Sequence, residues 1–336
     1  MLRTIASIVA LLVLSACGPS SAGAPIAEQW RAVEVNAAPI SFPREQIGRL
    51  RFRGGLELTS PDAVFGGLSG LEVLDGERLL IMNDDAEWFD THLVLDEAGA
   101  LIGLDQVRYA MMRDGNGQPY HGHAGDTEGL AQLLDGRFAV SFEQSQTIRI
   151  FDLNRDGPFG ESVAGPRLAE TRRLPSNAGL EALTITANGD LLVGAEGGLR
   201  ATTPLWRVPL DAGEPVAPLT AYPPRRGYSL TGLDRLPDGG FVALERFYAP
   251  IIGPRARITR FAEDALVEGE RVSGVEELAN LTPPLPLDNF EGIAAARMRD
   301  GATRIYIVSD DNYSPRQRTL LLAFDIVEDE GGARAD

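Results

Sequence analysis

Lysine is absent from this sequence of 336 residues, in which all 31 basic residues are arginine. Without lysine the chain has no Schiff-base lysine, no P-loop lysine and no serine–lysine dyad. Cysteine occurs once, at Cys17, and histidine occurs three times. A single cysteine forms no internal disulfide, and the domain that follows Cys17 has no thiol nucleophile. These absences remove lysine and thiol chemistry from the activities to be considered.

Several local motifs are also missing. The segment Gly67-Leu68-Ser69-Gly70 misses the second spacing of a Gly-x-Ser-x-Gly nucleophile elbow. The sequence contains no HExxH motif, P-loop, EF-hand loop or dinucleotide fingerprint. A serine-triad esterase is therefore poorly supported, although a triad does not require a local motif.

Positive charge is scarce relative to negative charge, and the net charge is -17. This balance argues against nucleic acid or an anionic membrane surface as a partner, because both require a basic surface. It suits a solvated protein that binds cations. Hydrophobic residues make up 44% of the chain, which is ample for a large core, and the 37 glycines and 22 prolines favour many short strands joined by turns.

The N-terminus has the features of a targeting segment. Arg3 precedes a short apolar run from Ile5 to Leu14, and small residues then lead to Cys17. This pattern is typical of a bacterial lipoprotein signal over residues 1–16, with lipid attached to Cys17. An ordinary secretory signal with a chance cysteine is the alternative. Gly18, rather than an acidic residue, follows Cys17 and favours the periplasmic face of the outer membrane. Residues 17–45 are expected to be a flexible tether, so that the lipid anchor is the only membrane contact.

A short phrase recurs along the rest of the chain. Its clearest copies are Asp288-Asn289-Phe290-Glu291-Gly292-Ile293-Ala294 and Asp126-Thr127-Glu128-Gly129-Leu130-Ala131. Looser copies occur at 67–71, 178–183 and 229–233. Each copy is followed by a turn and then by an apolar run that ends in acidic or polar residues. Taken from Leu68, Glu128, Glu181, Thr231 and Glu291, the repeat advances by 60, 53, 50 and 60 residues.

Self-similarity at this period, with about four short strands in each unit, predicts an all-β fold of the β-propeller type. Five blades are expected over residues 46–328, or six if a long insert hides a degenerate blade. The last unit has only three strands, so the isolated strand at 47–58 is predicted to join it and close the ring, which removes an open sheet edge. A β-sandwich with chance repeats is the alternative. Residues 329–336 are expected to form a disordered acidic tail.

The loops of a propeller bring equivalent positions of different blades to one face. Carboxylates gathered there repel one another, so their pKa values rise or a cation neutralises them. Oxygen ligands in a flexible arrangement favour Ca²⁺ as the bound ion. Solvated acids paired with arginine are the alternative. The predicted metal ligands follow the second strands of the first and last units and are Asp84, Asp85, Asp310 and Asp311.

The predicted catalytic residues include the three glutamates of the repeated phrase, Glu128, Glu181 and Glu291. His121 and His123 precede the second phrase on one face of an extended segment, where they would bind metal or act as general acid and base. A loop pair that only caps the channel is the alternative for these histidines. Arginine forks hold anionic groups bidentately. Arg246 and Arg316 are the predicted substrate-binding residues.

In combination, several segments resemble the phytase-like family described as "esterase-like activity of phytase". They are the copies at 65–71, 126–131 and 289–293, together with Ile307-Val308-Ser309-Asp310-Asp311-Asn312 and the closing segment 317–324. The resemblance covers roughly residues 48–326. It implies an exported bacterial propeller that hydrolyses phosphoesters or carboxylic esters. In the related β-propeller phytases, acids on one face hold several Ca²⁺ ions.

Residues and resemblance together lead to one hypothesis. The chain is expected to be a monomeric, lipid-anchored, calcium-dependent hydrolase of a small anionic ester at the cell envelope. The alternative is a non-catalytic envelope propeller that binds a ligand or a protein, because a fold alone does not imply chemistry.

Overall fold

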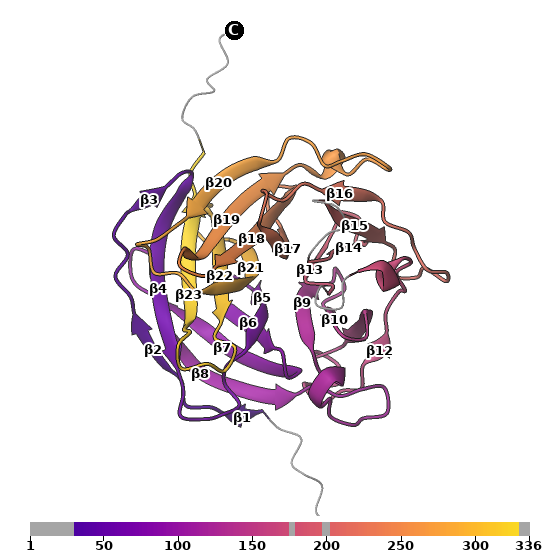
Figure 1. Cartoon of the computed structure of the whole chain (residues 1–336). Helices are drawn as coiled ribbons and strands as arrows, with labels where there is room; N and C mark the ends of the chain where they lie inside the picture. Colours follow the sequence, from indigo (N-terminus) through magenta and orange to yellow (C-terminus); the bar gives the residue numbers. More distant parts are fainter. Residues whose placement is uncertain (1–29, 175–178, 197–201, 329–336) are drawn as a thin grey trace, which may run out of the picture.

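The computed structural model describes residues 30–174, 179–196 and 202–328, which form five antiparallel sheets around a central axis. Figure 1 views the molecule along this axis. The predicted signal peptide, Cys17 and the acidic tail at 329–336 lie outside the described residues. Within these residues the only helical segments are three short 3-10 turns, η1 (Gly122–Ala124), η2 (Thr171–Arg173) and η3 (Glu263–Ala265).

The innermost strand of each sheet is formed by one copy of the repeated phrase. These strands are β5 (Leu68–Leu74), β9 (Thr127–Gln132), β13 (Ala182–Ile185), β17 (Ser229–Arg235) and β21 (Asn289–Arg297). Each contacts the innermost strands of the two neighbouring sheets, and β21 contacts β5, so the ring is continuous. The predicted five-bladed β-propeller is therefore confirmed.

The second and third strands of the blades pair with the inner strands in sequence order. The second strands are β6 (Arg78–Asn83), β10 (Phe138–Phe142), β14 (Leu191–Gly194), β18 (Phe241–Ala249) and β22 (Thr303–Asp310). The third strands are β7 (Glu87–Leu95), β11 (Thr147–Phe151), β15 (Thr203–Val208), β19 (Gly253–Phe261) and β23 (Thr319–Ile326).

The outer strands show how the N-terminal region is used. In the first four blades they are β8 (Leu101–Met111), β12 (Val163–Ala164), β16 (Thr220–Tyr222) and β20 (Glu276–Leu281). In the last blade, β4 (Leu50–Thr59) pairs antiparallel with β23, with Leu56 opposite Leu321 and Arg51 opposite Asp325. This blade therefore combines strands from both ends of the described chain.

Two local predictions were wrong. Residues 31–39, within the predicted flexible tether at 17–45, form strands: β1 (Arg31–Ala32) pairs with β8, and β2 (Asn36–Pro39) pairs with β4. Just after this segment, β3 (Gln46–Ile47) also pairs with β4. Their backbone amides satisfy open sheet edges, which a composition-based reading overlooks. The sequence near Thr171–Leu174 predicts the fourth strand of the second blade, but that strand is β12, and Thr171–Arg173 is the 3-10 turn η2.

The hydrophobic core consists of five clusters, each lying between two neighbouring blades. One cluster joins Trp88 of the first blade to Phe138 of the second, and another joins Leu192 of the third to Phe241 of the fourth. Both faces of a blade are thus covered, which explains why all eight residues of β22 are buried. This two-sided packing holds the inner strands in fixed positions around the axis.

Glycine allows the inner strands to approach one another closely. A Cβ atom added to Gly129 would lie 2.7 Å from the carbonyl oxygen of Glu181, and one added to Gly292 would lie 2.9 Å from that of Ser69. Both distances are too short for a side chain. Glycine at these two positions therefore allows neighbouring blades to come together at the axis, whereas Ala182 stands at the equivalent position of the third copy.

Candidate functional site

The repeated phrase contains a β-bulge that directs one side chain to the mouth of the channel. In β21 the pairing with β22 shifts between Phe290 and Gly292, so Glu291 has no partner residue in β22. The same shift leaves Ser69 of β5 and Thr231 of β17 without a partner residue in the neighbouring strand. A bulge of this kind re-aims a side chain. The five equivalent residues, Ser69, Glu128, Glu181, Thr231 and Glu291, all line a channel space of about 10 Å³.

These five positions are not chemically equivalent. The Ser69 hydroxyl donates a hydrogen bond to the carbonyl oxygen of Thr127, 2.8 Å away, and the Thr231 hydroxyl donates to that of Phe290, 3.3 Å away. Both hydroxyls therefore link neighbouring blades. Glu128, Glu181 and Glu291 place carboxylates at the remaining three positions, on the second, third and fifth blades, so the acids are distributed around the channel.

Two groups of carboxylates meet at this mouth. One oxygen from each of Asp84, Glu128 and Glu291 lies within 4.8 Å of the others. The same holds for Asp126, Glu128 and Glu143, so Glu128 belongs to both groups. Asp84 follows β6, Asp126 precedes β9 and Glu143 follows β10. Three blades thus contribute acids to one cluster.

The Oδ1 atom of Asp84 is the most informative atom of the cluster. It is buried and has no hydrogen-bond partner within the described chain. Burial, followed by the nearby carboxylates of Asp310 and Glu291, raises the pKa of Asp84 to about 10. A buried oxygen without a donor is unfavourable unless a proton or a cation lies beside it.

The three glutamates of the phrase share this electrostatic environment. Burial raises the pKa of Glu128 well above its usual range, and the carboxylates of Glu181 and Asp84 raise it further. Burial also raises the pKa of Glu181, with Glu196 and Glu291 as the next causes. The pKa of Glu291 rises to about 8, because burial outweighs the opposing effect of Arg246. The cluster therefore holds protons at neutral pH in the absence of a cation.

Arg246, on β18, provides the positive charge of the cluster. Its Nη1 atom donates to Glu291 Oε1 at 2.8 Å and also to Asn289 Oδ1, while Nη2 donates to Glu196 Oε1 at 2.8 Å. Asn289 also donates to Glu291 Oε1, 2.7 Å away. Both terminal nitrogens of Arg246 thus already hold protein acceptors, and they orient Glu291 toward the channel.

The predicted metal ligands occupy different environments. Asp84 belongs to the cluster, and the buried Asp310 raises the pKa of both Asp84 and Glu291. Asp311 Oδ1 instead accepts the backbone amides of Gly67 and Tyr313, at 3.0 and 3.1 Å. Asp85 is exposed and belongs to neither group of carboxylates.

The predicted histidines lie beside the mouth rather than in it. His121 and His123 are exposed on and next to η1, which precedes β9. In the described part of the chain, neither imidazole has a hydrogen-bond or ion-pair partner. Their catalytic role stays a prediction.

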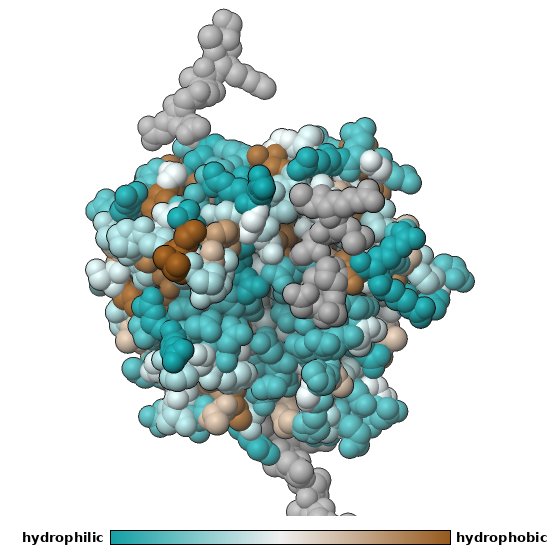
Figure 2. Space-filling view, in the orientation of Figure 1, coloured by the Kyte–Doolittle hydropathy of each residue, from teal (hydrophilic) through white to brown (hydrophobic). Residues whose placement is uncertain are grey.

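A groove of about 1020 Å³ opens beside the acidic cluster. It is lined by Arg246 and Arg316, the two predicted substrate-binding arginines, and also by Arg318, Asp288 and Glu196. Figure 2 shows that the surface around the channel mouth is predominantly hydrophilic. The exposed side chain of Arg316 has no ion-pair partner among the described residues, so it is available to an anionic ligand.

Some acids of the cluster were not among the predicted site residues. Asp126 and Glu143 complete the second group of carboxylates, and Glu196 binds Arg246. Asp126 opens a copy of the repeated phrase, and Glu143 and Glu196 follow second strands, so position in the repeat was a usable signal. Glu245 comes one position earlier in its repeat than Glu196, opposite Leu230, and it is buried against Arg257 and Tyr222, 2.6 Å from each. This residue belongs to the packing of the fourth blade.

A second layer of acids lies at the other end of the channel. Asp234 accepts the backbone amides of Arg235 and Ala295, each at 2.6 Å, and the hydroxyl of Thr184 at 3.2 Å. Glu72 accepts the backbone amide of Gln132 at 2.8 Å. These hydrogen bonds join the blades that carry Asp234 and Glu72 to the three other blades, which gives this layer a structural role.

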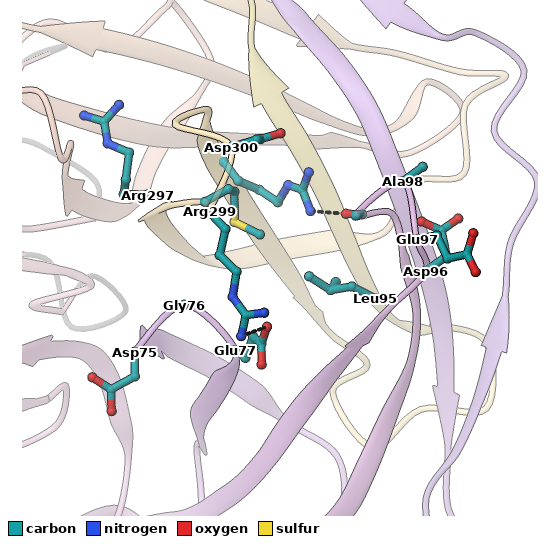
Figure 3. A pocket seen from close by; sticks show the side chains of 13 residues that line it. Asp75, Gly76, Glu77, Leu95, Asp96, Glu97, Ala98, Arg297, Arg299 and Asp300 are labelled. Atoms are coloured by element: carbon teal, nitrogen blue, oxygen red, sulfur yellow. Dashed lines mark hydrogen bonds and ion pairs between the residues drawn. The ribbon is translucent and has the colours of Figure 1, made fainter.

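Figure 3 shows a further cavity, of about 500 Å³, which is lined by strand-connecting turns of the first and last blades. Arg299 pairs with Glu77 across it at 2.8 Å, and Arg304 pairs with Asp325 at 2.7 Å. Its turns connect the ends of strands opposite to Asp84 and Glu291. The cavity is therefore remote from the acidic cluster, and its main charges are already paired.

Comparison with known proteins identifies the family. The model of the phytase-like family, described as "esterase-like activity of phytase", matches residues 63–313. No curated protein matches the sequence. The chain belongs to the phytase-like family.

Similar solved structures are distant. A protein of unknown function from Dyadobacter fermentans is 13% identical, with 89% of this chain and 96% of that chain covered and a TM-score of 0.43. The PQQ-bound aldose sugar dehydrogenase from Streptomyces coelicolor is 10% identical, with 87% and 98% covered and a TM-score of 0.39. Virginiamycin B lyase from Staphylococcus aureus is 12% identical, with 83% and 87% covered and a TM-score of 0.35. At these scores the likeness carries no argument about function.

Proposed function

We propose that this phytase-like protein is a calcium-dependent hydrolase of phosphoesters or related carboxylic esters at the bacterial cell envelope. One observation carries the proposal: the buried, unpartnered Oδ1 of Asp84 lies in a cluster where two groups of carboxylates share Glu128. Such a cluster is stable when a cation replaces the protons that it otherwise holds.

The donors of the cluster fit a hard divalent cation. All are carboxylate oxygens, with no histidine or cysteine in either group. Ca²⁺ prefers oxygen ligands from several chain segments and tolerates irregular geometry. Asp84, Glu128 and Glu291 would hold one ion, and Asp126 and Glu143 would join Glu128 around a neighbouring one. Asp310 lies near the Asp84 and Glu291 carboxylates, and its negative charge would help to hold the first ion.

The residues around the cluster divide the work of ester hydrolysis. A bound divalent cation polarises the ester and lowers the pKa of an attacking water. Glu181 has no hydrogen-bond donor of its own among the described residues and lies at the channel mouth, so it would accept the proton of that water. Arg246 and Asn289 hold the Glu291 carboxylate in place. Arg316, at the rim of the groove, would bind the anionic part of the substrate.

Lipidation at Cys17 belongs to the same proposal. The anchored chain would act as a monomer on a small anionic ester at the periplasmic face of the outer membrane. No helix of the described residues is long and apolar enough to cross a membrane. Mass spectrometry of the N-terminal peptide tests the anchor: an acylated Cys17 supports it, and an unmodified mature N-terminus contradicts it.

A non-catalytic propeller that binds a ligand at the envelope is the second candidate. The observation that favours it is that Arg246 already donates hydrogen bonds to Glu196, Glu291 and Asn289. An arginine whose N–H groups are occupied in this way is less able to stabilise the charge of a reacting group. In that case the open groove with Arg316 at its rim would be the binding surface.

Turnover of the full chain distinguishes the two candidates. The purified protein is assayed on aryl phosphates and short-chain aryl esters, with Ca²⁺ and with a chelator. Hydrolysis that requires Ca²⁺ supports the proposal. Absence of turnover in both conditions supports the binding protein instead, whereas turnover that survives chelation keeps the enzyme and discards the cation.

Two matched substitutions locate the activity. Glu291→Gln changes the acidic cluster, and Glu72→Gln makes the same change at the other end of the channel. Only Glu291→Gln should abolish calcium-dependent turnover. Equal kinetics for Glu291→Gln and the unmodified protein would show that the repeated glutamates serve the fold alone.

A further inference from the structure

The hairpin that joins β18 to β19 carries an exposed apolar tip. Ile251 is fully exposed at the turn, Ile252 is 48% exposed, and Tyr248 is 69% exposed on the strand below it. The backbone of Ile251 has a φ of 77°, a conformation that is unfavourable for a β-branched residue. Two isoleucines at the end of a hairpin are thus held in solvent without an apolar neighbour to cover them, which marks an interaction site.

An arginine-rich pocket lies directly below this tip. Phe247 and Arg255 face each other across the hairpin. The Arg255 guanidinium lies 5.9 Å from the Phe247 ring, whose centroid is 5.3 Å from that of Tyr228. Arg225 stands 5.9 Å from the Tyr228 ring, and Arg226 completes the lining of a cavity of about 370 Å³. The site therefore combines three arginines with two aromatic rings.

The acids packed against the pocket leave two of these arginines uncompensated. Glu277 lies 3.5 Å from Arg225 and 2.6 Å from Arg257, and Glu245 also pairs with Arg257. Within the described residues, Arg226 and Arg255 have no carboxylate partner. The Nε atom of Arg255 is buried without a hydrogen-bond acceptor. This region is thus locally positive on a chain whose net charge is -17.

The spacing between tip and pocket matches a membrane interface. Three residue steps separate Ile252 from Arg255, or about 10 Å along a strand. Apolar residues of interfacial elements enter a bilayer by about 5–10 Å, with tyrosine at the headgroup level. Isoleucines at the tip would then reach the acyl boundary while the arginines lie at the depth of the lipid phosphates.

We propose that the β18–β19 hairpin docks onto the surface of an anionic phospholipid membrane. Ile251 and Ile252 insert into the acyl boundary, Tyr248 lies at the interface, and Arg226 and Arg255 bind a headgroup phosphate. This is a membrane contact in addition to the lipid anchor on Cys17. Tyr248 and Pro254 also line the groove beside the acidic cluster, so docking turns that groove toward the bilayer. The inference stands independently of the proposed hydrolysis.

Tryptophan fluorescence tests the insertion directly. Every variant is made in the full chain with Cys17→Ser, so that no acyl chain contributes to binding. Any effect of residues 1–29 is then the same in all variants. Ile251→Trp is compared with Leu134→Trp, which alters an exposed leucine in the β9–β10 turn at the other end of the blades. On vesicles of phosphatidylglycerol and phosphatidylcholine, only Trp at position 251 should shift to shorter wavelength and be quenched by brominated lipid. An unshifted, unquenched signal from Ile251→Trp would overturn the proposal.

Vesicle composition and charge variants test the phosphate contact. Co-sedimentation should be stronger with phosphatidylglycerol present than with phosphatidylcholine alone, and Arg226→Gln and Arg255→Gln should each weaken it about fivefold, as expected for one arginine at an anionic surface. Arg172→Gln, which alters an exposed arginine on η2, is the control and should leave binding unchanged. Because Arg226 is exposed, its variant tests the contact even if Arg255→Gln destabilises the hairpin. Equal binding to both vesicles, unaffected by either substitution, would exclude the pocket as a headgroup site.

Discussion

At one end of the channel, Asp234 accepts two backbone amides and a hydroxyl from neighbouring strands, while at the other end Asp84 Oδ1 is buried without a donor. Apolar residues such as Leu233 separate the two layers. Both layers consist of carboxylates contributed by the same inner strands or by the loops beside them. They differ in the number of protein donors that each oxygen receives.

This difference distinguishes a structural acid from a candidate site. Where N–H groups of the next blade point at a carboxylate, the acid fixes the position of the two blades. Where only other carboxylates approach it, repulsion remains until a proton or a cation is bound. The distribution of donors, rather than the number of acids, thus identifies the end of the channel that we propose as the site. The following predictions test this contrast.

The largest effect is expected from pH in the absence of cations. Burial raises the pKa of Asp310 to about 6, of Glu291 to about 8 and of Asp84 to about 10. An acid with a raised folded pKa stabilises the fold below its unfolded pKa near 4, and this stability is lost as pH rises through the folded value. The free energy of unfolding should therefore fall by several kcal/mol between about pH 5 and pH 9, since each group contributes about 1.4 kcal/mol per pH unit of its range.

Thermal unfolding with chelator and with Ca²⁺ measures this dependence. Calcium should raise the Tm, and the increase should grow with pH, because ion binding replaces protons that are already leaving. A chelated protein whose Tm is the same at pH 5 and pH 9 would contradict the electrostatic description of the cluster.

Removing the structural acid should destabilise the fold. Asp234→Ala leaves the buried amides of Arg235 and Ala295 without acceptors, which costs about 3 kcal/mol. Chemical denaturation measures the loss. Asp234→Asn keeps an acceptor oxygen and should lose less, and a similar stability for Asp234→Ala and the unmodified protein would remove the distinction between the two layers.

Removing the carboxylate that both groups share should abolish the proposed activity without unfolding the chain. Glu128→Gln takes a charge from both carboxylate groups. Calcium-dependent turnover should fall about 100-fold or more, which corresponds to about 2.7 kcal/mol in the activation free energy. The fold should be retained, as judged by circular dichroism. Retention of the activity in this variant would show that the cation, if bound, is held elsewhere.

Neutralising Asp84 should stabilise the protein when no cation is present. Asp84→Asn keeps the shape of the side chain and, near four other carboxylates, removes the free-energy cost of protonating Asp84 when the chain folds. A gain of about 1–2 kcal/mol is expected at pH 8 with chelator, together with weaker calcium binding in isothermal titration calorimetry. A loss of stability would mean that Asp84 has a stabilising donor in the fold.

The smallest effect is expected at the two histidines beside the mouth. His121→Asn and His123→Asn alter exposed side chains without partners in the described chain, so stability should change by less than about 0.5 kcal/mol. Turnover should remain within about twofold if these residues are not part of the machinery. A larger fall in kcat for either variant would restore the catalytic role predicted for it.

The amino-acid sequence was sufficient for the architecture because a blade repeats its backbone pattern. Phrases at Leu68, Glu128 and Glu291 recur where inner strands begin, and an X-Gly turn follows each of them. The apolar run Ile305–Val308 within β22 reflects burial on both faces of a blade. Short edge strands were missed, because β12 and β1 have only two residues each and no periodicity to recognise.

The composition of the candidate site was only partly predictable. Position in the repeat placed Glu128, Glu181 and Glu291 at one channel mouth, as expected for equivalent residues. The prediction did not distinguish Asp310 from Asp311, although Asp310 approaches the cluster while Asp311 accepts backbone amides. Neighbours in sequence on a strand face opposite sides, so a shift of one residue changes every partner.

Sequence alone determined that the chain is a propeller and favoured five blades, because periodicity is a local property repeated along it. Tertiary structure decided which carboxylates receive donors, because those donors come from another blade. Asp234 takes the amide of Ala295, 61 residues away, whereas no N–H group of the described chain reaches Asp84 Oδ1. Contacts between blades depend on distances across the ring, and no spacing within one repeat encodes them.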